Sequence, residues 1–301
     1  MTWFILSLIA MVFWSGSDFF SKLGSKPDDT YSHWKMVMAV GLVMGIHAFV
    51  MIASGTPFSL DAIIKYMPAS FCYILSMIFG YVGLRYIELS ISSPVCNSSG
   101  AVAAVLCAIF LGQRMLGYQL VGVVLITLGI VLLQKIDLGL DEERKRADNK
   151  YKRSAKAIIF PLLYCAIDGL GTFVDALILD GGMLPEETAN IAYELTFLGM
   201  AIFAFIYVVI VKKQKIFASK QEFTRREIPK LLGACSETAG QFAYIFAIGA
   251  NAVLAAPMIA AYCMLSMVWS RIFLKEKLTR SQYIVIGIAI AGIILLGIGD
   301  A

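Results

Sequence analysis

Charged residues are scarce in this sequence. Asp, Glu, Lys and Arg make up 15% of the 301 residues, whereas 59% are hydrophobic and the mean hydropathy is +0.79. An ordinary soluble domain has about 25% charged residues. A helix that crosses a bilayer needs about 20 apolar residues, and several segments reach this length. The composition therefore excludes a soluble globular protein and predicts an all-α integral membrane protein embedded in the lipid bilayer.

Groupings of residues that carry chemistry are also missing. The sequence shows no nucleophile–base constellation, no phosphate-binding loop and no cluster with metal-ligand spacing, so we expect no enzyme, no cofactor and no metal. The net charge of +4 does not indicate nucleic-acid binding, because the basic residues sit in a few short loops. The six cysteines lie inside apolar segments without any Cys-x-x-Cys pair, which predicts small buried residues: Cys72, Cys96, Cys107, Cys165, Cys235 and Cys263.

One short match to a catalytic motif remains. The residues from Gly297 to Asp300 are similar to the Gly-x-Gly-Asp of intramembrane aspartyl proteases. Such an enzyme needs two aspartates that face each other in the middle of the membrane, whereas Asp300 follows the last apolar segment. We treat the match as chance. An intramembrane enzyme or a sensor remains as the alternative from a different functional class.

Ten apolar segments have the length of membrane-spanning helices. A polar segment at 136–155 carries charges of both signs and no apolar stripe, so we expect a solvated loop there. This loop divides the chain into a first five-helix repeat at 1–135, a linker at 136–155 and a second five-helix repeat at 156–301. The predicted spans are 3–24, 33–54, 67–86, 90–111, 117–135, 156–178, 189–211, 229–249, 252–274 and 281–299.

The two halves share a sequence pattern at a constant offset. The stretch from Leu84 to Leu133 recurs 163 positions later. Because each half has five spans, the second half enters the membrane in the opposite sense. The sequence therefore predicts ten transmembrane helices as two inverted five-helix repeats, an architecture typical of secondary transporters. The matching positions are Pro94 with Pro257, Gln113 with Glu276, Arg114 with Lys277, Gln119 with Gln282 and Gly129 with Gly292.

The basic residues indicate which loops face the cytoplasm. Every Lys and Arg except Lys65 and Arg114 lies in or beside an odd-numbered loop. Cytoplasmic loops of membrane proteins carry an excess of Lys and Arg. We therefore expect the odd-numbered loops in the cytoplasm and both termini outside.

The duplicated stretches resemble the paired tails of EamA-type domains, which belong to the drug/metabolite transporter superfamily. The resemblance covers both halves and implies a ten-helix transporter of the plasma (inner) membrane. Family members carry amino acids, nucleobases, amines and other metabolites, often as exporters and often with proton coupling. The matching features are the Arg85-Tyr86 entry, the helix prolines Pro94 and Pro257, the turns at Gly112 to Arg114 and at Lys275 to Lys277, and the glycine-spaced last helix.

Aspartates in two corresponding spans are the first site candidates. Trp14 and Asp18 lie four residues apart in the first span, and Tyr164 and Asp168 have the same spacing in the sixth. Residues four apart share a helix face. Ionisable groups inside a span are costly and usually face a cavity. We expect two aromatic–carboxylate pairs directed at one central cavity.

Structural roles for these acids stay open. Asp18 would be structural if it neutralised Lys22, one turn along the same helix face. Asp175 shares the face of Asp168 but lies near a helix end, so a site and an interfacial position are equally acceptable. Glu194 is either a site residue or part of a solvated helix end. His47 is better explained as a hydrogen-bonded structural histidine than as a site residue.

The eighth span adds a polar stripe. Glu237, Gln241 and Tyr244 follow the spacing i, i+4, i+7 and so lie along one face. Glu237 lies about two turns inside the helix, a depth suited to a proton carrier. In the fourth span Asn97 is a binding candidate, and Tyr262 is a further one in the ninth.

These residues predict the kind of substrate. Several carboxylates and aromatic rings suit an amine or another cationic head group through cation–π contact. The proton-coupling candidates are Asp18, Asp168 and Glu237, with H⁺ as the coupling ion. The alternative is an exporter of amino acids or of other zwitterionic or neutral metabolites, in which Lys22 would hold a carboxylate. Either way the partners are a small molecule and the bilayer, without nucleic acid, and the protein is a monomer or homodimer.

Overall fold

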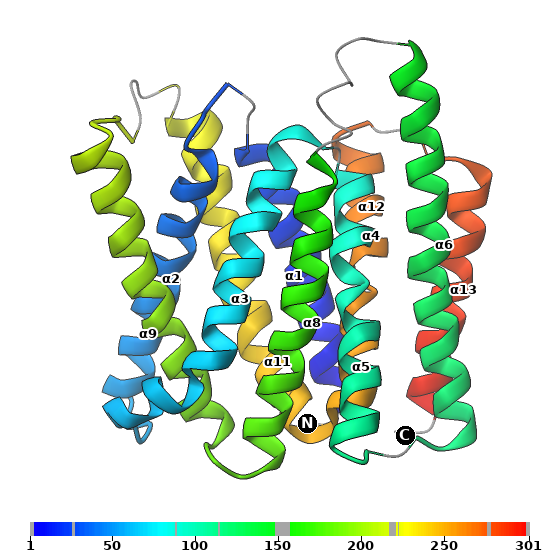
Figure 1. Ribbon diagram of the computed structural model, residues 1–301, viewed down its shortest axis with the longest axis horizontal. Helices are drawn as coiled ribbons and strands as arrows, with labels where there is room; N and C mark the ends of the chain where they lie inside the picture. The colour runs from blue at the N-terminus through cyan, green and yellow to red at the C-terminus, as the bar shows by residue number, and fades with distance from the viewer. Residues whose placement is uncertain are drawn as a thin grey trace.

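The computed structural model describes residues 3–25, 28–87, 89–113, 115–147, 157–216, 221, 223–275 and 278–298, and these form helices without any strand. The helices stand side by side, and α1 begins at the same end of the molecule at which α13 ends (Figure 1). Their bounds are α1 Trp3–Gly24, α2 Ser32–Ala53, α3 Leu60–Tyr86, α4 Leu89–Asn97, α5 Ser99–Phe110, α6 Gly117–Ala147, α8 Ile159–Asp180, α9 Glu186–Phe205, η2 Ile206–Val211, η3 Phe223–Glu227, α11 Ile228–Ala260, α12 Tyr262–Phe273 and α13 Arg280–Ile298.

The described residues hold eight helices that are long and apolar enough to cross a membrane, together with one shorter apolar helix at Gly117–Leu133. One of the eight, Phe223–Phe273, is 51 residues long, far more than one crossing needs. Its backbone leaves the helical conformation at Asn251, where φ is −166° and ψ is 83°. The predicted helical membrane fold is confirmed, whereas length and composition alone do not establish the count of ten.

Side-chain contacts show that this long segment turns back on itself. Glu237 accepts a hydrogen bond from Ser17, and Ser266 donates one to Asp18, the next residue of α1. Residues 237 and 266 would lie about 44 Å apart along a straight helix. The chain therefore reverses between them, and Figure 1 shows α12 returning beside α1 and α4. The segment accounts for two passes, as the predicted eighth and ninth spans require.

Backbone details repeat at the offset of 163 residues. The first repeat breaks its helix at Ser98 and the second at Ala261, each four residues after the matching proline. At both breaks one bond tightens to the i→i−3 type: Ala101 N–H donates to Ser98 C=O, and Met264 N–H donates to Ala261 C=O. The duplicated sequence thus folds into a duplicated local structure.

The helices that correspond in the two halves meet in antiparallel fashion. On α2, His47 Nδ1 lies within 2.9 Å of Glu194, and Met51 Sδ accepts from Asn190 Nδ2 at 3.8 Å, both of α9. On α6, Gly122 lies against Leu296 and Gly129 against Ala289 of α13. In each pair the residue numbers rise on one helix as they fall on the other. Counterpart helices therefore run in opposite directions, as an inverted repeat requires.

Two predicted boundaries differ from the structure. The third span was expected from residue 67, but α3 begins at Leu60, where Asp61 in its first turn favours a helix start. The expected loop at 136–155 is helical up to Ala147, because α6 continues past its apolar part. Glu, Lys and Arg, which fill this stretch, have high helix propensity and override the absence of an apolar stripe. The remaining predicted linker residues, 148–155, lie outside the described part.

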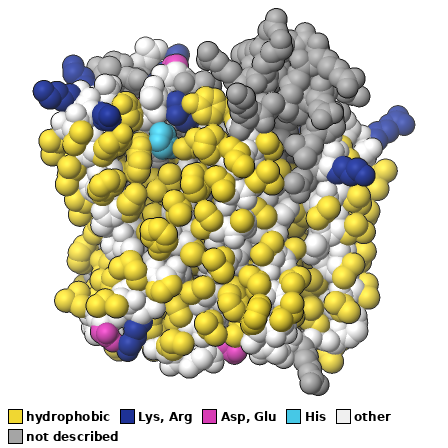
Figure 2. Space-filling model, viewed as in Figure 1, with side chains coloured by type: hydrophobic (Ala, Val, Ile, Leu, Met, Phe, Trp, Pro, Cys, Tyr) yellow, Lys and Arg dark blue, Asp and Glu magenta, His cyan; other side chains and the backbone are white. Residues whose placement is uncertain are grey.

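The surface separates into an apolar belt and a charged end. Figure 2 shows hydrophobic side chains over most of the flank and Lys and Arg gathered toward one edge. We call this edge the basic end; α1, α3, α6, η2 and α12 end there. The opposite end contains the connections after α2, α5 and α8, with the acidic residues Asp61, Asp180, Glu186 and Glu187. Assigning the basic end to the cytoplasm remains a prediction.

The turn between the last two helices of each repeat provides a test of the duplication. Gly112 has φ +65°, and its counterpart Lys275 has φ +58°, a left-handed conformation that costs a non-glycine residue about 1 kcal/mol. We predict that Lys275→Gly stabilises the protein by up to that amount, raising Tm in detergent. Lys275→Ala is the control and should give no such gain, because Ala pays the same steric cost. An equal or lower Tm for the glycine variant would contradict the left-handed conformation of Lys275.

Candidate functional site

A central cavity lies between the two repeats. Helices α1, α3, α4, α5, α8, α9, α11 and α12 line it. Toward the basic end its lining reaches Ser21, three residues before α1 ends, and Leu84, two residues before α3 ends. The nine residues predicted to bind substrate or to carry protons all line this cavity: Trp14, Asp18, Asn97, Tyr164, Asp168, Glu237, Gln241, Tyr244 and Tyr262.

Two of the carboxyl groups are held by serines at different depths. Asp18 accepts hydrogen bonds from Ser93 and, at 3.0 Å, from Ser266. Asp168 accepts from Ser76 at 3.2 Å and from Ser99 at 2.8 Å. Six residues separate Ser93 from Ser99 along α4 and α5, about 9 Å of helix. The two aspartates therefore occupy different levels of the cavity.

The third carboxyl group belongs to Glu237, which accepts a hydrogen bond from Ser17 at 2.7 Å. Ser17 precedes Asp18 on α1, so Glu237 lies at the level of Asp18 rather than at that of Asp168. Among the described residues, none of the three carboxyl groups has a Lys, Arg or His within ion-pair distance. Nor do three acidic, His or Cys side chains in the described part gather closely enough to hold a metal ion.

Lys22 does not neutralise Asp18. Its ammonium donates to the carbonyl oxygens of Leu84, at 2.8 Å, and Ile87, at the end of α3. These carbonyls would otherwise lack helical partners. The structural alternative for Asp18, an ion pair one turn along α1, is therefore absent from the structure.

Aromatic rings form one wall of the cavity. The indole of Trp14 lies 4.8 Å from the ring of Tyr244 and 5.8 Å from that of Tyr262, between centroids. Gly240 makes this approach possible, because a Cβ there would lie 2.4 Å from Trp14 Cδ1. Similarly, Tyr164 packs on Gly80, where a Cβ would come within 2.9 Å of its ring. The aromatic residue of each predicted aromatic–carboxylate pair thus lies against a glycine of a facing helix.

A buried network lies on the side of the cavity toward the opposite end. Asp175 is fully buried and accepts from Tyr66 at 2.7 Å and from Tyr73 at 3.2 Å. The hydroxyls of Tyr73 and Tyr244 are 2.6 Å apart, and Tyr244 donates to Thr172 at 3.1 Å. We call these five residues the tyrosine network; it ties α3 of the first repeat to α8 and α11 of the second. Asp175 is thus not interfacial, and it lies beside the cavity lining.

The sequence reasoning missed the tyrosines of α3. Tyr66, Tyr73 and Tyr81 are spaced by seven and eight residues, so they fall on one helix face. All three are buried, and Tyr73 and Tyr81 line the cavity. This spacing was a usable signal, but polar aromatic residues are also common at membrane interfaces, which hides it.

Glu194 is buried away from the cavity lining. Both of its carboxylate oxygens lie within 2.9 Å of His47 Nδ1, across the contact of α9 with α2. The expectation of a structural histidine agrees with this pairing. A solvated helix end does not fit a fully buried Glu194.

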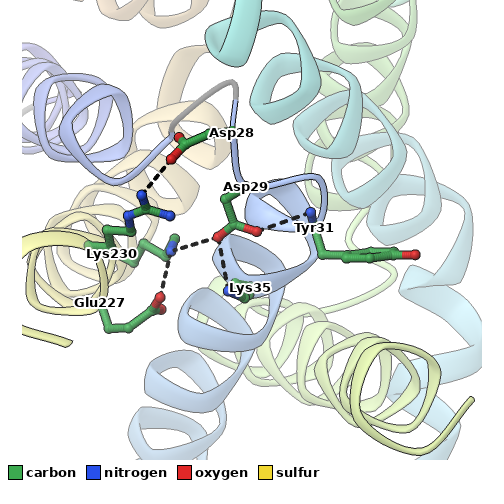
Figure 3. A network of polar contacts seen from close by, with 7 residues as sticks. Asp28, Asp29, Tyr31, Lys35, Glu227 and Lys230 are labelled. Carbon is green, nitrogen blue, oxygen red and sulfur yellow. Dashed lines mark hydrogen bonds and ion pairs between the residues drawn. The ribbon is translucent and has the colours of Figure 1, made fainter. Parts of the chain in front are cut away.

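A second charged cluster lies at the basic end and was not foreseen. Asp29 contacts Lys35 at 2.9 Å and Lys230 at 3.9 Å, and Lys230 also contacts Glu227 at 2.9 Å (Figure 3). Lys230 has no solvent exposure. Because each charge has an opposite partner, this cluster is a structural tie between the α1–α2 connection and the start of α11.

Asp300, on which an intramembrane protease would depend, lies outside the described residues, as do Arg114, Glu276 and Lys277 of the repeated turns.

Comparison with solved structures supports the fold. One chain, entitled only "Crystal structure of protein", is similar with a TM-score of 0.64 and 14% sequence identity, covering 98% of this chain and 97% of that one. No curated protein matches the sequence. The model of the EamA-like transporter family matches residues 1–134 and 156–298. With both halves matched, the chain belongs to the EamA-like transporter family, a membrane-transporter family of the drug/metabolite transporter superfamily.

Proposed function

We propose that this protein is a secondary active transporter of a small amine or another cationic metabolite. The observation that carries the proposal is the charge of the cavity. Asp18, Asp168 and Glu237 face one cavity, with no cationic side chain in ion-pair contact among the described residues. Carboxylates removed from water without a counter-charge are costly. A bound cation or a proton would remove that cost, and the surrounding aromatic rings add cation–π attraction.

Proton coupling follows from the same carboxyl groups. A proton and a cation compete for one carboxylate, so binding of one favours release of the other. The serine partners suit both states, because a hydroxyl can donate to a carboxylate and can accept from a protonated carboxyl. Ser17, Ser93 and Ser99 could therefore keep the site hydrogen-bonded through a complete exchange cycle.

Alternating access is the proposed transport mechanism. The tyrosine network separates the cavity from the opposite end, whereas the lining reaches within one helical turn of the basic end. An inverted repeat supplies the second state when the two halves exchange conformations. The proposal sets the protein in the plasma (inner) membrane with the basic end in the cytoplasm.

The amino acid alternative has less support. It assigned the substrate carboxylate to Lys22, whose ammonium instead binds the carbonyl oxygens at the end of α3. Lys22 is also not part of the cavity lining. A zwitterion would have to bind its carboxylate without this lysine, among three carboxyl groups.

The proton-exchange proposal predicts the effect of neutralising single acids. Asp18→Asn or Glu237→Gln should abolish amine transport driven by a pH gradient in proteoliposomes, because neither amide can exchange a proton for a cation. The matched control is Asp61→Asn, which removes an exposed carboxylate paired with Lys65 outside the cavity. Tm in detergent should show that all three variants fold. Full transport by both cavity variants would eliminate the mechanism.

The closed end provides a separate prediction. Tyr73→Phe removes the hydroxyl that links Asp175 to Tyr244. Losing about 1 kcal/mol of hydrogen bonding should raise the population open to the opposite end about fivefold. The measurement is the labelling rate of Cys96, which lines the cavity, by a charged thiol reagent applied from that end to a protein with Cys96 as its single cysteine.

Tyr283→Phe is the control for this experiment, since Tyr283 is 53% exposed on α13 and outside the cavity. Its labelling rate should equal that of the parent. If Tyr73→Phe also leaves the rate unchanged, the tyrosine network is not the closed gate.

A further inference from the structure

Four buried polar groups of the cavity lining lack a hydrogen-bond partner among the described residues, and besides the hydroxyls of Ser21 and Tyr81 these are two groups that can only donate. Trp14 Nε1 and Gln241 Nε2 are buried atoms without a hydrogen-bond partner among the described residues. Both residues line the cavity, and Gln241 is only 3% exposed. An indole N–H can donate but cannot accept, so Trp14 has no alternative way to satisfy it. A buried donor left unpaired destabilises the state in which it is unpaired.

Trp14 meets α11 next to Gln241, in the contact of α1 with α11. A Cβ at Gly240 would lie 2.7 Å from Trp14 Nε1, so the polar edge of the indole rests on α11 one residue before Gln241. The missing side chain at Gly240 is what lets the indole N–H approach this position. The rings of Tyr244 and Tyr262 pack against the indole and fix its orientation.

The donor pair has a defined place relative to the carboxyl groups. Trp14 is one turn from Asp18 on α1, and Gln241 is one turn from Glu237 on α11. In both helices the step is about 6 Å along the axis. The two donors therefore lie one turn along both helices from carboxyl groups that would hold a cation.

We propose that Trp14 and Gln241 form an acceptor subsite that binds a neutral oxygen of the substrate. The inference rests on the proposed cation transport and narrows its substrate to amines that also carry a hydroxyl or carbonyl a few bonds from the nitrogen. The oxygen is neutral, because three nearby carboxyl groups would repel a substrate carboxylate. Sites built to pair a polar substrate group reject analogues that lack it, so this pair determines specificity.

Calorimetric titration of the purified protein with three ligands of equal chain length tests the subsite. The ligands are butylamine, aminobutanol and aminobutanoate. Wild type should bind aminobutanol at least about tenfold more tightly than butylamine, because only the alcohol satisfies the donors. Trp14→Phe and Gln241→Leu should each reduce this preference to less than about threefold.

The control variants are Trp34→Phe and Gln214→Leu, which change the same residue types outside the cavity and should keep the wild-type preference. Equal affinities of wild type for butylamine and aminobutanol would overturn the subsite while leaving cation binding intact. Tightest binding of aminobutanoate would overturn the neutrality of the bound oxygen. If no amine binds, the proposed function itself fails. If Trp14→Phe does not fold, the comparison rests on Gln241→Leu.

Discussion

Carboxyl groups inside a membrane are expensive, and the centre of this protein depends on how that cost is met. Five serine hydroxyls do so, and four of the five bonds cross between the repeats, the exception being the bond from Ser93 to Asp18 within the first. Asp18 of the first repeat binds Ser266 of the second, and Glu237 of the second binds Ser17 of the first. Asp168 of the second repeat binds two serines of the first. The carboxyl groups thus join the two halves at the place where transport would require them to move. In the proposed mechanism, exchanging a proton for a cation changes these bonds directly, which links ligand binding to conformation.

The duplication gives the two repeats the same local backbone features. The helix breaks at Ser98 and Ala261 and the left-handed residues Gly112 and Lys275 occur at equal offsets. The tyrosine contacts differ. Tyr73 and Tyr244 meet near the opposite end, whereas the repeat counterpart of Tyr244 is Tyr81, whose hydroxyl has no hydrogen-bond partner among the described residues. The helix framework is thus symmetric between the repeats, whereas these tyrosine contacts are not. In the proposed alternating-access mechanism this asymmetry distinguishes one of the two states from the other.

The fold could be predicted from hydropathy and from the repeat, because bilayer thickness and helix geometry set the length of each span. The cavity residues were also predictable, because a polar residue inside a span needs a specific environment. Asp168 and Gln241 were found in this way. The partners of the carboxyl groups were not predictable: serine is common in spanning helices, and only the helix packing selects Ser93, Ser99 and Ser266. Nor does spacing reveal that Lys22 turns to backbone carbonyls, because a helix face does not specify a rotamer. The 136–155 segment was misjudged because helix propensity acts without an apolar stripe.

The central claim is that a cation and a proton share the carboxyl groups of one cavity. The most direct test is to titrate the purified protein with an amine by calorimetry in two buffers that differ in ionisation enthalpy, at mildly acidic and at neutral pH. The account predicts that the observed heat depends on the buffer, with a net release of protons on binding that grows toward acidic pH as more of the carboxyl groups carry a proton. Binding with the same heat in both buffers at either pH would mean that no proton is displaced, and would contradict the account.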